Sequence, residues 1–350
     1  PSVLGMSSPG QKPTLMSILR PYGVRSLASN HRSCFQAALL SYEATCILEW
    51  GAHSSLDPKP LGVGKTVLTA TLGIIGYPIA HSISPIFQQA ALDHCGIDAT
   101  YQPFEVAPEQ VGRFVVDLRR DGAWGINVTV PHKEAVIPYI DEVDEWATAA
   151  GAVNTIVNRE GRLTGHNTDG LGFLRALRNE GGFVPEGSRV LVLGAGGAAR
   201  GVVLALSRAK VATITIANRT LERGQRLAGL AQSADTDGLA IPLDGKDLTE
   251  AAGAADLIVN CTTIGMSHGP DEAGSPLPAA SIPSKVLVND LVYNPLETPL
   301  LKAAAQVGAT CLGGIHMLIY QGAASFEMWT GQDAPTAVML EAATKAMSAR

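Results

Sequence analysis

The chain contains the run Gly125-Ile126-Asn127-Val128-Thr129-Val130-Pro131-His132-Lys133, which is rich in β-branched residues and breaks at a proline. Its alternating apolar residues predict a strand. A proline cannot continue a sheet ladder but suits the first turn of a helix, so we expect a helix to begin at Pro131. Lys133 then lies where a strand passes into a helix, at the edge where open α/β sheets bind their ligands.

Lys133 at such an edge is a candidate proton-transfer group. The alternative is a solvated surface lysine, which is what most lysines are. The rest of the chain decides between the two readings, because a catalytic lysine needs binding and charge partners close to it in the fold.

The residues before this run predict an alternation of strands and helices. Apolar strands are expected at 72–76 and 100–106. A helix should follow Ser84-Pro85, with Ser84 as its N-cap, and should end at Gly96. A second helix is expected at about 108–121. This β-α-β-α-β order predicts an α/β unit whose sheet is mostly parallel.

A second unit begins at about Arg189. Residues 190–193 form an apolar strand, and Gly194-Ala195-Gly196-Gly197-Ala198-Ala199 follows before an apolar helix through Leu206. This G-x-G-x-x-A pattern between a strand and a helix is typical of a dinucleotide-binding turn, in which the second glycine lets the backbone approach a pyrophosphate.

The next strand, 212–217, ends in Asn218-Arg219-Thr220, with Arg223 one turn further on. An NAD site usually places an acidic residue there, whereas arginines pair with the 2′-phosphate of NADP. The pattern therefore favours NADP. The competing reading is that Arg219 and Arg223 are surface arginines at the start of a helix.

The remaining elements are less distinctive. Strands are expected at 257–260 and 286–290, a helix should start at Thr298-Pro299 and end at Gly308, and helices at 315–328 and 334–346 complete the chain. Tyr293 follows a strand end, and Gln321 lies within an apolar helix, where a buried amide needs a partner. Each is either a ligand contact or a satisfied core polar group.

Composition limits the function classes. With 350 residues, an apolar fraction of 46% and a charged fraction of 17%, the chain predicts a two-domain α/β protein. A net charge of −6 favours a small-molecule partner over nucleic acid. No apolar run is long enough for a membrane span. The five scattered cysteines lack paired metal spacing, so we expect no metal site. We expect a cytoplasmic protein in which these thiols are reduced.

Residues 1–70 show no clear fold. The first acidic residue is Glu43, and Lys12, Arg20, Arg25 and Arg32 precede it among many serines. That composition is compatible with a linker or with a leader in residues 1–42 that directs import into an organelle. We expect no catalytic role for this segment.

Several motifs together resemble the shikimate dehydrogenase family over about residues 71–350. They are His81-Ser82-Ile83-Ser84-Pro85, Asn127-Val128-Thr129-Val130-Pro131-His132-Lys133, Gly151-Ala152-Val153-Asn154-Thr155, Asn167-Thr168-Asp169-Gly170, the glycine turn, Asn218-Arg219-Thr220 and Met317-Leu318-Ile319-Tyr320-Gln321. His132 stands where phenylalanine is frequent in the family, and Gly313-Gly314-Ile315-His316 varies the usual Gly-Leu-x-Met entry. Neither change removes a group that the reaction needs.

The resemblance implies a substrate domain, 71–169 plus 314–350, with a Rossmann NADP domain, 170–313, inserted into it. It implies that Lys133 and Asp169 are catalytic. Substrate contacts would be Ser82, Ser84 and Tyr293 to a carboxylate, and Thr129, Lys133, Asn154, Asp169 and Gln321 to hydroxyls. Cofactor contacts would be Gly194, Ala195, Gly196, Gly197, Ala198, Asn218, Arg219, Thr220 and Arg223, with Leu291 and Gly314 near the nicotinamide.

The implied reaction is the reversible NADPH-dependent reduction of 3-dehydroshikimate to shikimate by a monomer or homodimer. Two alternatives stay open: an NAD-preferring quinate/shikimate dehydrogenase, and a catalytically silent paralogue that senses the ligand. Ser8-Pro9-Gly10-Gln11 also resembles a loop of type I dehydroquinase, an enzyme sometimes fused ahead of this one, and is a candidate remnant of it.

Overall fold

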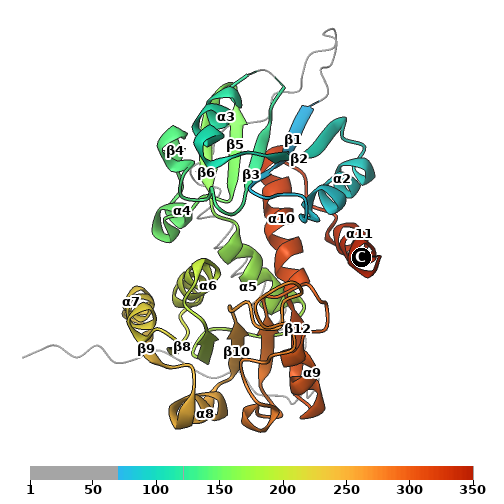
Figure 1. Ribbon diagram of the computed structural model, residues 1–350. Helices are drawn as coiled ribbons and strands as arrows, with labels where there is room; N and C mark the ends of the chain where they lie inside the picture. Colours follow the sequence, from blue (N-terminus) through green and yellow to red (C-terminus); the bar gives the residue numbers. More distant parts are fainter. Residues whose placement is uncertain (1–69, 121, 350) are drawn as a thin grey trace, which may run out of the picture. The chain divides into compact units, whose positions relative to one another are not determined.

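Two six-stranded sheets with helices packed on them make up the described part of the chain (Figure 1). The computed structural model describes residues 70–120 and 122–349. The predictions about the leader and the dehydroquinase-like loop lie outside the described residues.

The first sheet has the strand order β2-β1-β3-β5-β6-β4. Its strands are β1 (Ala70–Gly76), β2 (Ala99–Glu105), β3 (Gly125–Val128), β4 (Glu142–Val143), β5 (Thr155–Arg159) and β6 (Arg162–His166). The β1–β2, β1–β3 and β4–β6 pairs are parallel, whereas β5 is antiparallel to β3 and β6. A largely parallel sheet is therefore confirmed, with one hairpin that turns at Glu160-Gly161, both at positive φ.

Helices cover both faces of this sheet. They are α2 (Ser84–His94), α3 (Val111–Asp117), α4 (Glu145–Ala150), α10 (Gly314–Thr330) and α11 (Thr336–Ser348), with short 3-10 turns η1 (Pro108–Gln110) and η2 (Ile137–Tyr139). Successive strand residues point to opposite faces. Leu72 and Ile74 of β1 accordingly pack in the cluster with α2, α10 and α11, while Ile75 packs in the cluster with α3. The C-terminal helices thus return to the first sheet.

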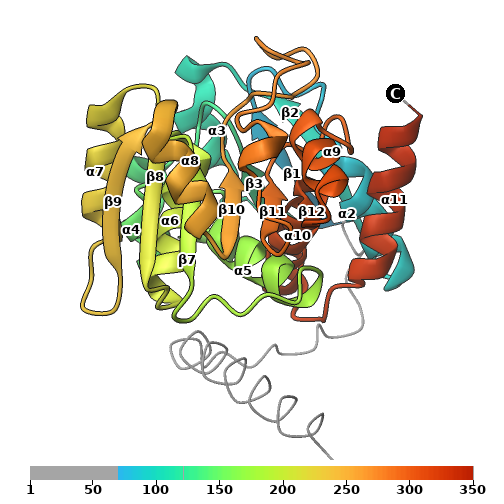
Figure 2. The same cartoon turned by 90° about the horizontal axis from the view of Figure 1, so that it is seen from below.

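The second sheet is fully parallel, with the order β12-β11-β10-β7-β8-β9 (Figure 2). Its strands are β7 (Arg189–Leu193), β8 (Thr213–Asn218), β9 (Asp237–Pro242), β10 (Leu257–Asn260), β11 (Leu287–Asp290) and β12 (Thr310–Gly313). This is the doubly wound order of a dinucleotide-binding sheet. Strands are added on one side of β7 up to β9 and on its other side from β10 onward, so the strand order reverses between β7 and β10. In such sheets ligands bind at the carboxyl ends of the strands at this point.

Its helices are α5 (Asp169–Asn179), α6 (Gly197–Arg208), α7 (Leu221–Ala231), α8 (Gly245–Ala254) and α9 (Pro299–Gln306), with η3 (Ala279–Ser281). In β7, Val190 and Val192 join the cluster of α5, α6 and α7, whereas Leu191 and Leu193 join that of α8 and α9. A continuous apolar strand is required because both faces of the sheet are buried.

The prediction that a helix begins at Pro131 is wrong. Residues 129–136 form turns and lead into η2, and the Val130–Pro131 peptide is cis. The Lys133 carbonyl accepts a hydrogen bond from the Val153 amide at 2.8 Å. In an α-helix this carbonyl would accept from the amide four residues ahead, but here it accepts from a residue in a distant loop. Lys133 still follows the carboxyl end of β3.

Two other helix predictions need adjustment. The helix expected at 108–121 is a 3-10 turn followed by the shorter α3. Ser84 is the first helical residue of α2 rather than its N-cap, and the cap position belongs to Ile83. The hydroxyl of Ser82 instead accepts the Ser84 amide at 3.3 Å. Thr298, by contrast, caps α9 as predicted, since its side chain accepts from the Leu301 amide.

Candidate active site

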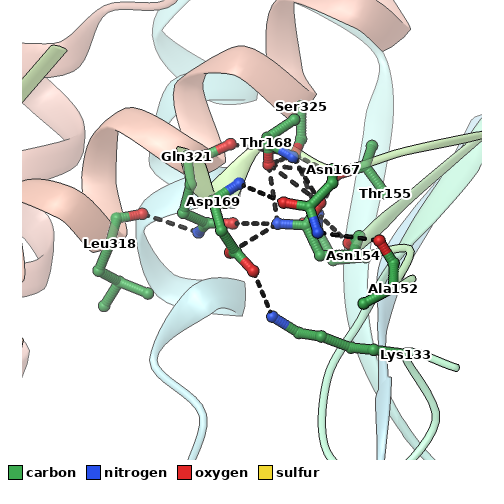
Figure 3. A network of polar contacts seen from close by, with 11 residues as sticks. Lys133, Ala152, Asn154, Thr155, Asn167, Thr168, Asp169, Leu318, Gln321 and Ser325 are labelled. Carbon is green, nitrogen blue, oxygen red and sulfur yellow. Dashed lines mark hydrogen bonds and ion pairs between the residues drawn. The ribbon is translucent and has the colours of Figure 1, made fainter. Parts of the chain in front are cut away.

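Lys133 and Asp169 meet at the carboxyl end of β3. The Lys133 Nζ donates to Asp169 Oδ2 at 2.6 Å, and Figure 3 shows the two side chains pointing toward one another. Asp169 opens α5, so the start of that helix presents the carboxylate. The side chains are 30% and 23% exposed, so both reach solvent while remaining paired. The sequence placed these residues 36 positions apart, and the fold brings them into contact.

Asn154 holds the other oxygen of Asp169. The backbone amide of Thr168 donates to Asn154 Oδ1 at 2.8 Å, which fixes the orientation of the side-chain amide because only an oxygen can accept that bond. Asn154 Nδ2 therefore faces Asp169 Oδ1 at 2.8 Å and Gln321 Oε1 at 3.4 Å. Both carboxylate oxygens of Asp169 are thus engaged by protein donors.

A cluster of buried polar side chains surrounds Asn154. Thr155 Oγ1 lies 2.8 Å from Ser325 Oγ, and both residues are labelled in Figure 3. Asn127 Nδ2 donates to the same serine oxygen at 3.0 Å. The Tyr101 hydroxyl donates to Asn127 Oδ1 at 2.7 Å, and burial raises the pKa of that phenol well above its ordinary value. Sequence reasoning missed Ser325, because a single serine within an apolar helix carries no motif.

Gln321 is placed by close contact between α5 and α10, which lie side by side in Figure 1. Gly172 permits that approach, since a Cβ at this position would lie 2.5 Å from the backbone nitrogen of Gln321. The Gln321 Nε2 donates to Leu318 O at 2.8 Å, and its Oε1 faces Asn154. The side-chain amide of Gln321 is therefore satisfied by Leu318 O and by Asn154, the residue that also holds Asp169.

The remaining substrate candidates lie on neighbouring elements. Thr129 continues β3, and its amide donates to Ile75 O at 2.9 Å. Ser84 is 6% exposed and lies one turn before Gln88, whose Nε2 donates at 2.9 Å to Gly322 O, the residue after Gln321. Tyr293 packs against the apolar cluster that contains residues of α2 and α10.

The glycine turn forms an open cradle at the start of α6. Gly194 has φ +100°, and a Cβ there would lie 3.0 Å from the Thr262 methyl. At Gly196 and Gly197, by contrast, a Cβ would meet none of the described atoms within 4 Å. The first helical turn carries no negative charge, so its exposed amides and the helix dipole suit a phosphate.

The junction between β8 and α7 is basic. Arg219 and Arg223 are exposed at the β8–α7 junction, and neither side chain pairs with another of the described residues. Asn218 Nδ2 donates to Thr220 O at 2.7 Å and shapes the same turn. Two uncommitted guanidinium groups beside a dinucleotide turn fit a phosphorylated ribose.

Leu291 and Gly314 meet beside the second sheet. A Cβ on Gly314 would lie 2.3 Å from the Leu291 carbonyl oxygen, so only glycine fits at this first residue of α10. No group of three or more metal-ligating side chains occurs in residues 70–120 and 122–349. In those same ranges, no helix is long and apolar enough to cross a bilayer.

Three family models match separate parts of the chain. Residues 74–156 match the shikimate dehydrogenase substrate binding domain, 181–267 match shikimate / quinate 5-dehydrogenase, and 314–344 match the shikimate 5'-dehydrogenase C-terminal domain. A shikimate dehydrogenase (NADP(+)) of Methanopyrus kandleri is 46% identical over 276 residues, which span 78% of this chain and 94% of the relative. The chain belongs to the shikimate dehydrogenase family.

Solved shikimate dehydrogenase structures share the fold. The enzyme of Thermus thermophilus, crystallised with NADP(H) and shikimate, has a TM-score of 0.71 and 39% identity, covering 79% of this chain and 99% of that one. Another shikimate dehydrogenase, solved with NADP+, has a TM-score of 0.74 and 39% identity over 83% and 99% of the two chains. The two-sheet α/β architecture is therefore that of the shikimate dehydrogenase family.

Proposed function

We propose that the chain catalyses the reversible NADPH-dependent reduction of 3-dehydroshikimate to shikimate, a step toward chorismate and the aromatic amino acids. Membership of a family whose named relatives are NADP(+) shikimate dehydrogenases supports this activity. The observation that carries the proposal is the Lys133–Asp169 pair at 2.6 Å, held at the carboxyl end of β3. A ketone that gains a hydride must also gain a proton, and this pair can deliver one.

NADPH supplies the hydride when it is bound. Lys133, as an ammonium, donates a proton from Nζ to the substrate oxygen, which then becomes the hydroxyl of shikimate. Asp169 holds the ammonium through Oδ2 and is itself held through Oδ1 by Asn154, so the donor is fixed before the reaction. Lys133 regains its proton from solvent, which its partial exposure permits.

We assign the substrate contacts as follows. Ser82, Ser84 and Tyr293 bind the carboxylate, and the first turn of the 11-residue helix α2 adds a favourable dipole. Thr129, Lys133, Asn154, Asp169 and Gln321 bind the hydroxyls. The contacts among Lys133, Asp169, Asn154 and Gln321 support the second group, because they bring donors and acceptors together in one place.

We assign NADP to the glycine turn and the basic junction. The amides of Gly194, Ala195, Gly196, Gly197 and Ala198 would hold the pyrophosphate. Asn218, Arg219, Thr220 and Arg223 would hold the phosphorylated ribose, and Leu291 with Gly314 would border the nicotinamide. The open cradle and the uncommitted arginines support these roles.

The proposal divides the chain into a substrate domain, 71–169 with 314–350, and an NADP domain, 170–313. The packing of α10 and α11 on the β1 face supports the return of the C-terminal segment to the first domain. We also propose a cytoplasmic location, in line with the free thiols of Cys95, Cys261 and Cys311, and a monomer or homodimer.

One assay tests the activity and its alternatives. Initial rates of NADPH and NADH formation are measured with shikimate and with quinate. We expect the highest kcat/KM for shikimate with NADP. A preference for quinate with NAD would favour the alternative of an NAD-preferring quinate/shikimate dehydrogenase. The absence of turnover with all four pairs, together with measurable shikimate binding, would favour the silent paralogue.

A further inference from the structure

Asp290 is a fully buried carboxylate that the proposed chemistry does not use. It ends β11 and has 0% exposure. Its Oδ1 accepts from Asn260 Nδ2 at 2.9 Å and from the Val292 amide at 3.0 Å, and its Oδ2 accepts from Thr298 Oγ1 at 2.6 Å. Burying such a group requires full hydrogen bonding, and here both oxygens are satisfied.

All three of these hydrogen-bond partners donate to Asp290. The Leu301 amide donates to Thr298 Oγ1, so the threonine proton is free to point at Asp290. Burial raises the pKa of the Asp290 carboxyl, and the hydrogen bonds from Thr298, Val292 and Asn260 oppose that rise. The three donors match an ionised carboxylate, whereas an amide at this position would place its own donors against them.

This carboxylate closes one loop at both ends. Its bonds to Val292 and Thr298 tie together the start and finish of the segment 291–298, which carries Leu291 and Tyr293. Leu291 is fixed by its amide, which donates to Asn260 O at 3.0 Å, and by its contact with Gly314. Tyr293 packs toward the cluster of α2 and α10.

The same network reaches the glycine turn. Asn260 Oδ1 accepts from the Thr262 amide at 2.9 Å and from its hydroxyl at 2.7 Å. The Thr262 methyl in turn lies against Gly194. One buried carboxylate therefore holds segments that border the proposed pyrophosphate, nicotinamide and substrate-carboxylate contacts.

We propose that Asp290 is a positioning residue that couples the substrate contact of Tyr293 to the cofactor contacts at Leu291 and the glycine turn. The inference rests on the proposed function, because it uses the assigned roles of Tyr293 and Leu291. This coupling role differs from a purely structural role in one respect. Loss of Asp290 must weaken the contribution of Tyr293 to shikimate binding while leaving the contribution of Lys133 to turnover intact.

A double-mutant cycle tests this difference. Asp290→Asn keeps the shape and should raise the KM values for shikimate and NADP, with kcat lower by about tenfold. Tyr293→Phe should raise the shikimate KM strongly in the native background and at least about threefold less in the Asp290→Asn background, as expected for coupled residues. Lys133→Met should cost the same factor in kcat in both backgrounds.

Additive effects of Asp290→Asn and Tyr293→Phe would overturn the inference, as would an equal loss of the Lys133 and Tyr293 contributions. If Asp290→Asn does not fold, Thr298→Val and Thr298→Ser replace it. The serine keeps the hydroxyl and should retain the full Tyr293 effect, whereas valine should lose it; equal behaviour of the two would overturn the inference.

Two controls separate this test from the proposed function. Asp256→Asn changes a carboxylate that is paired with Arg189 at the amino ends of β7 and β10, away from the carboxyl ends where Asp290 lies. It should leave the kinetic constants unchanged. An inactive native chain would refute the proposed function itself, whereas an active native chain with additive effects refutes only the role of Asp290.

Discussion

Lys133 owes its position to its backbone as much as to its side chain. Its carbonyl is bound by the Val153 amide, one residue before Asn154, and its ammonium is bound by Asp169. The turn after β3 therefore connects the lysine to the same two segments that supply its polar partners. A helix starting at Pro131 would have removed the first of these bonds.

Lys133→Met tests the proton-transfer role. The substitution removes the proton donor but leaves Ser82, Ser84 and the glycine turn to bind both ligands. Turnover should fall by roughly 10²–10⁴-fold, the range for a general acid–base group, with a smaller change in the shikimate KM. Steady-state kinetics in both directions provides the measurement.

The double variant supplies the control for this prediction. Asp169→Asn should cost a similar factor, and combining it with Lys133→Met should cost less than the product, because paired residues act as a unit. A strong rise in KM with turnover nearly intact would mean that Lys133 only anchors a hydroxyl, and the proton-transfer role would have to be given up.

The residues proposed to contact ligands were easier to predict than the residues that hold them in place. Lys133, Asn154, Asp169 and Gln321 lie in recognisable motifs, and their mutual contacts agree with that prediction. Ser325 was not predictable, because its importance depends on Asn127 and on strand β5 lying opposite it in the folded protein. No local pattern in the sequence encodes that proximity.

At the scale of elements, the contact between α5 and α10 fixes Gln321. Gly172→Ala would place a methyl carbon 2.5 Å from the backbone nitrogen and 2.8 Å from the Cα of Gln321, where only movement of a helix can relieve the overlap. We expect a loss of about 1–3 kcal/mol in the free energy of unfolding, and a lower activity because Gln321 shifts. Urea denaturation and kcat/KM provide the two measurements.

Gly229→Ala is the matched control for Gly172→Ala. It lies within α7, where a Cβ would meet none of the described atoms within 4 Å. Alanine should stabilise this helix by about 0.4–1 kcal/mol without changing activity. If both substitutions behaved alike, close approach of α5 and α10 would not be the reason for glycine at position 172.

We propose that the β8–α7 junction sets the cofactor preference. Arg219→Asp removes a charge-assisted partner of the 2′-phosphate, worth on the order of 1.5–3 kcal/mol, and adds repulsion. NADP should therefore weaken much more than NAD, as measured by the ratio of their kcat/KM values. Arg226→Asp, an exposed arginine further along α7, should leave that ratio unchanged. An unaltered ratio in the Arg219 variant would refute the phosphate assignment.

Elements were predictable where burial is two-sided. The central strands β7 and β10 are continuous apolar runs, because helices cover both of their faces. The edge strands β9 and β12 were missed: β9 mixes Asp237, Gly238 and Pro242 with apolar residues, and β12 fully buries only Leu312. An edge strand needs less burial, so its sequence carries a weaker signal.

At the scale of the molecule, the chain leaves the first sheet, builds the second and returns. Periodicity predicted α10 and α11 as helices but could not say which sheet they would cover. Only the resemblance to a family implied the return, and their packing against Leu72 and Ile74 agrees with it. The choice depends on long-range burial, which a local pattern does not specify.

The chain from residue 69 to 350 should be sufficient for catalysis. Every proposed site residue lies between Ser82 and Gln321, and the first family match begins at residue 74. A truncated chain that retains all of β1 should therefore keep near full kcat and KM values. The measurement compares both chains at equal active-site concentration, with Lys133→Met in the truncated chain as the inactive reference. If the truncated chain folds, as judged by circular dichroism and cooperative melting, yet loses turnover, residues 1–68 must complete the site, and the assignment of the substrate contacts to residues 82–321 would be insufficient.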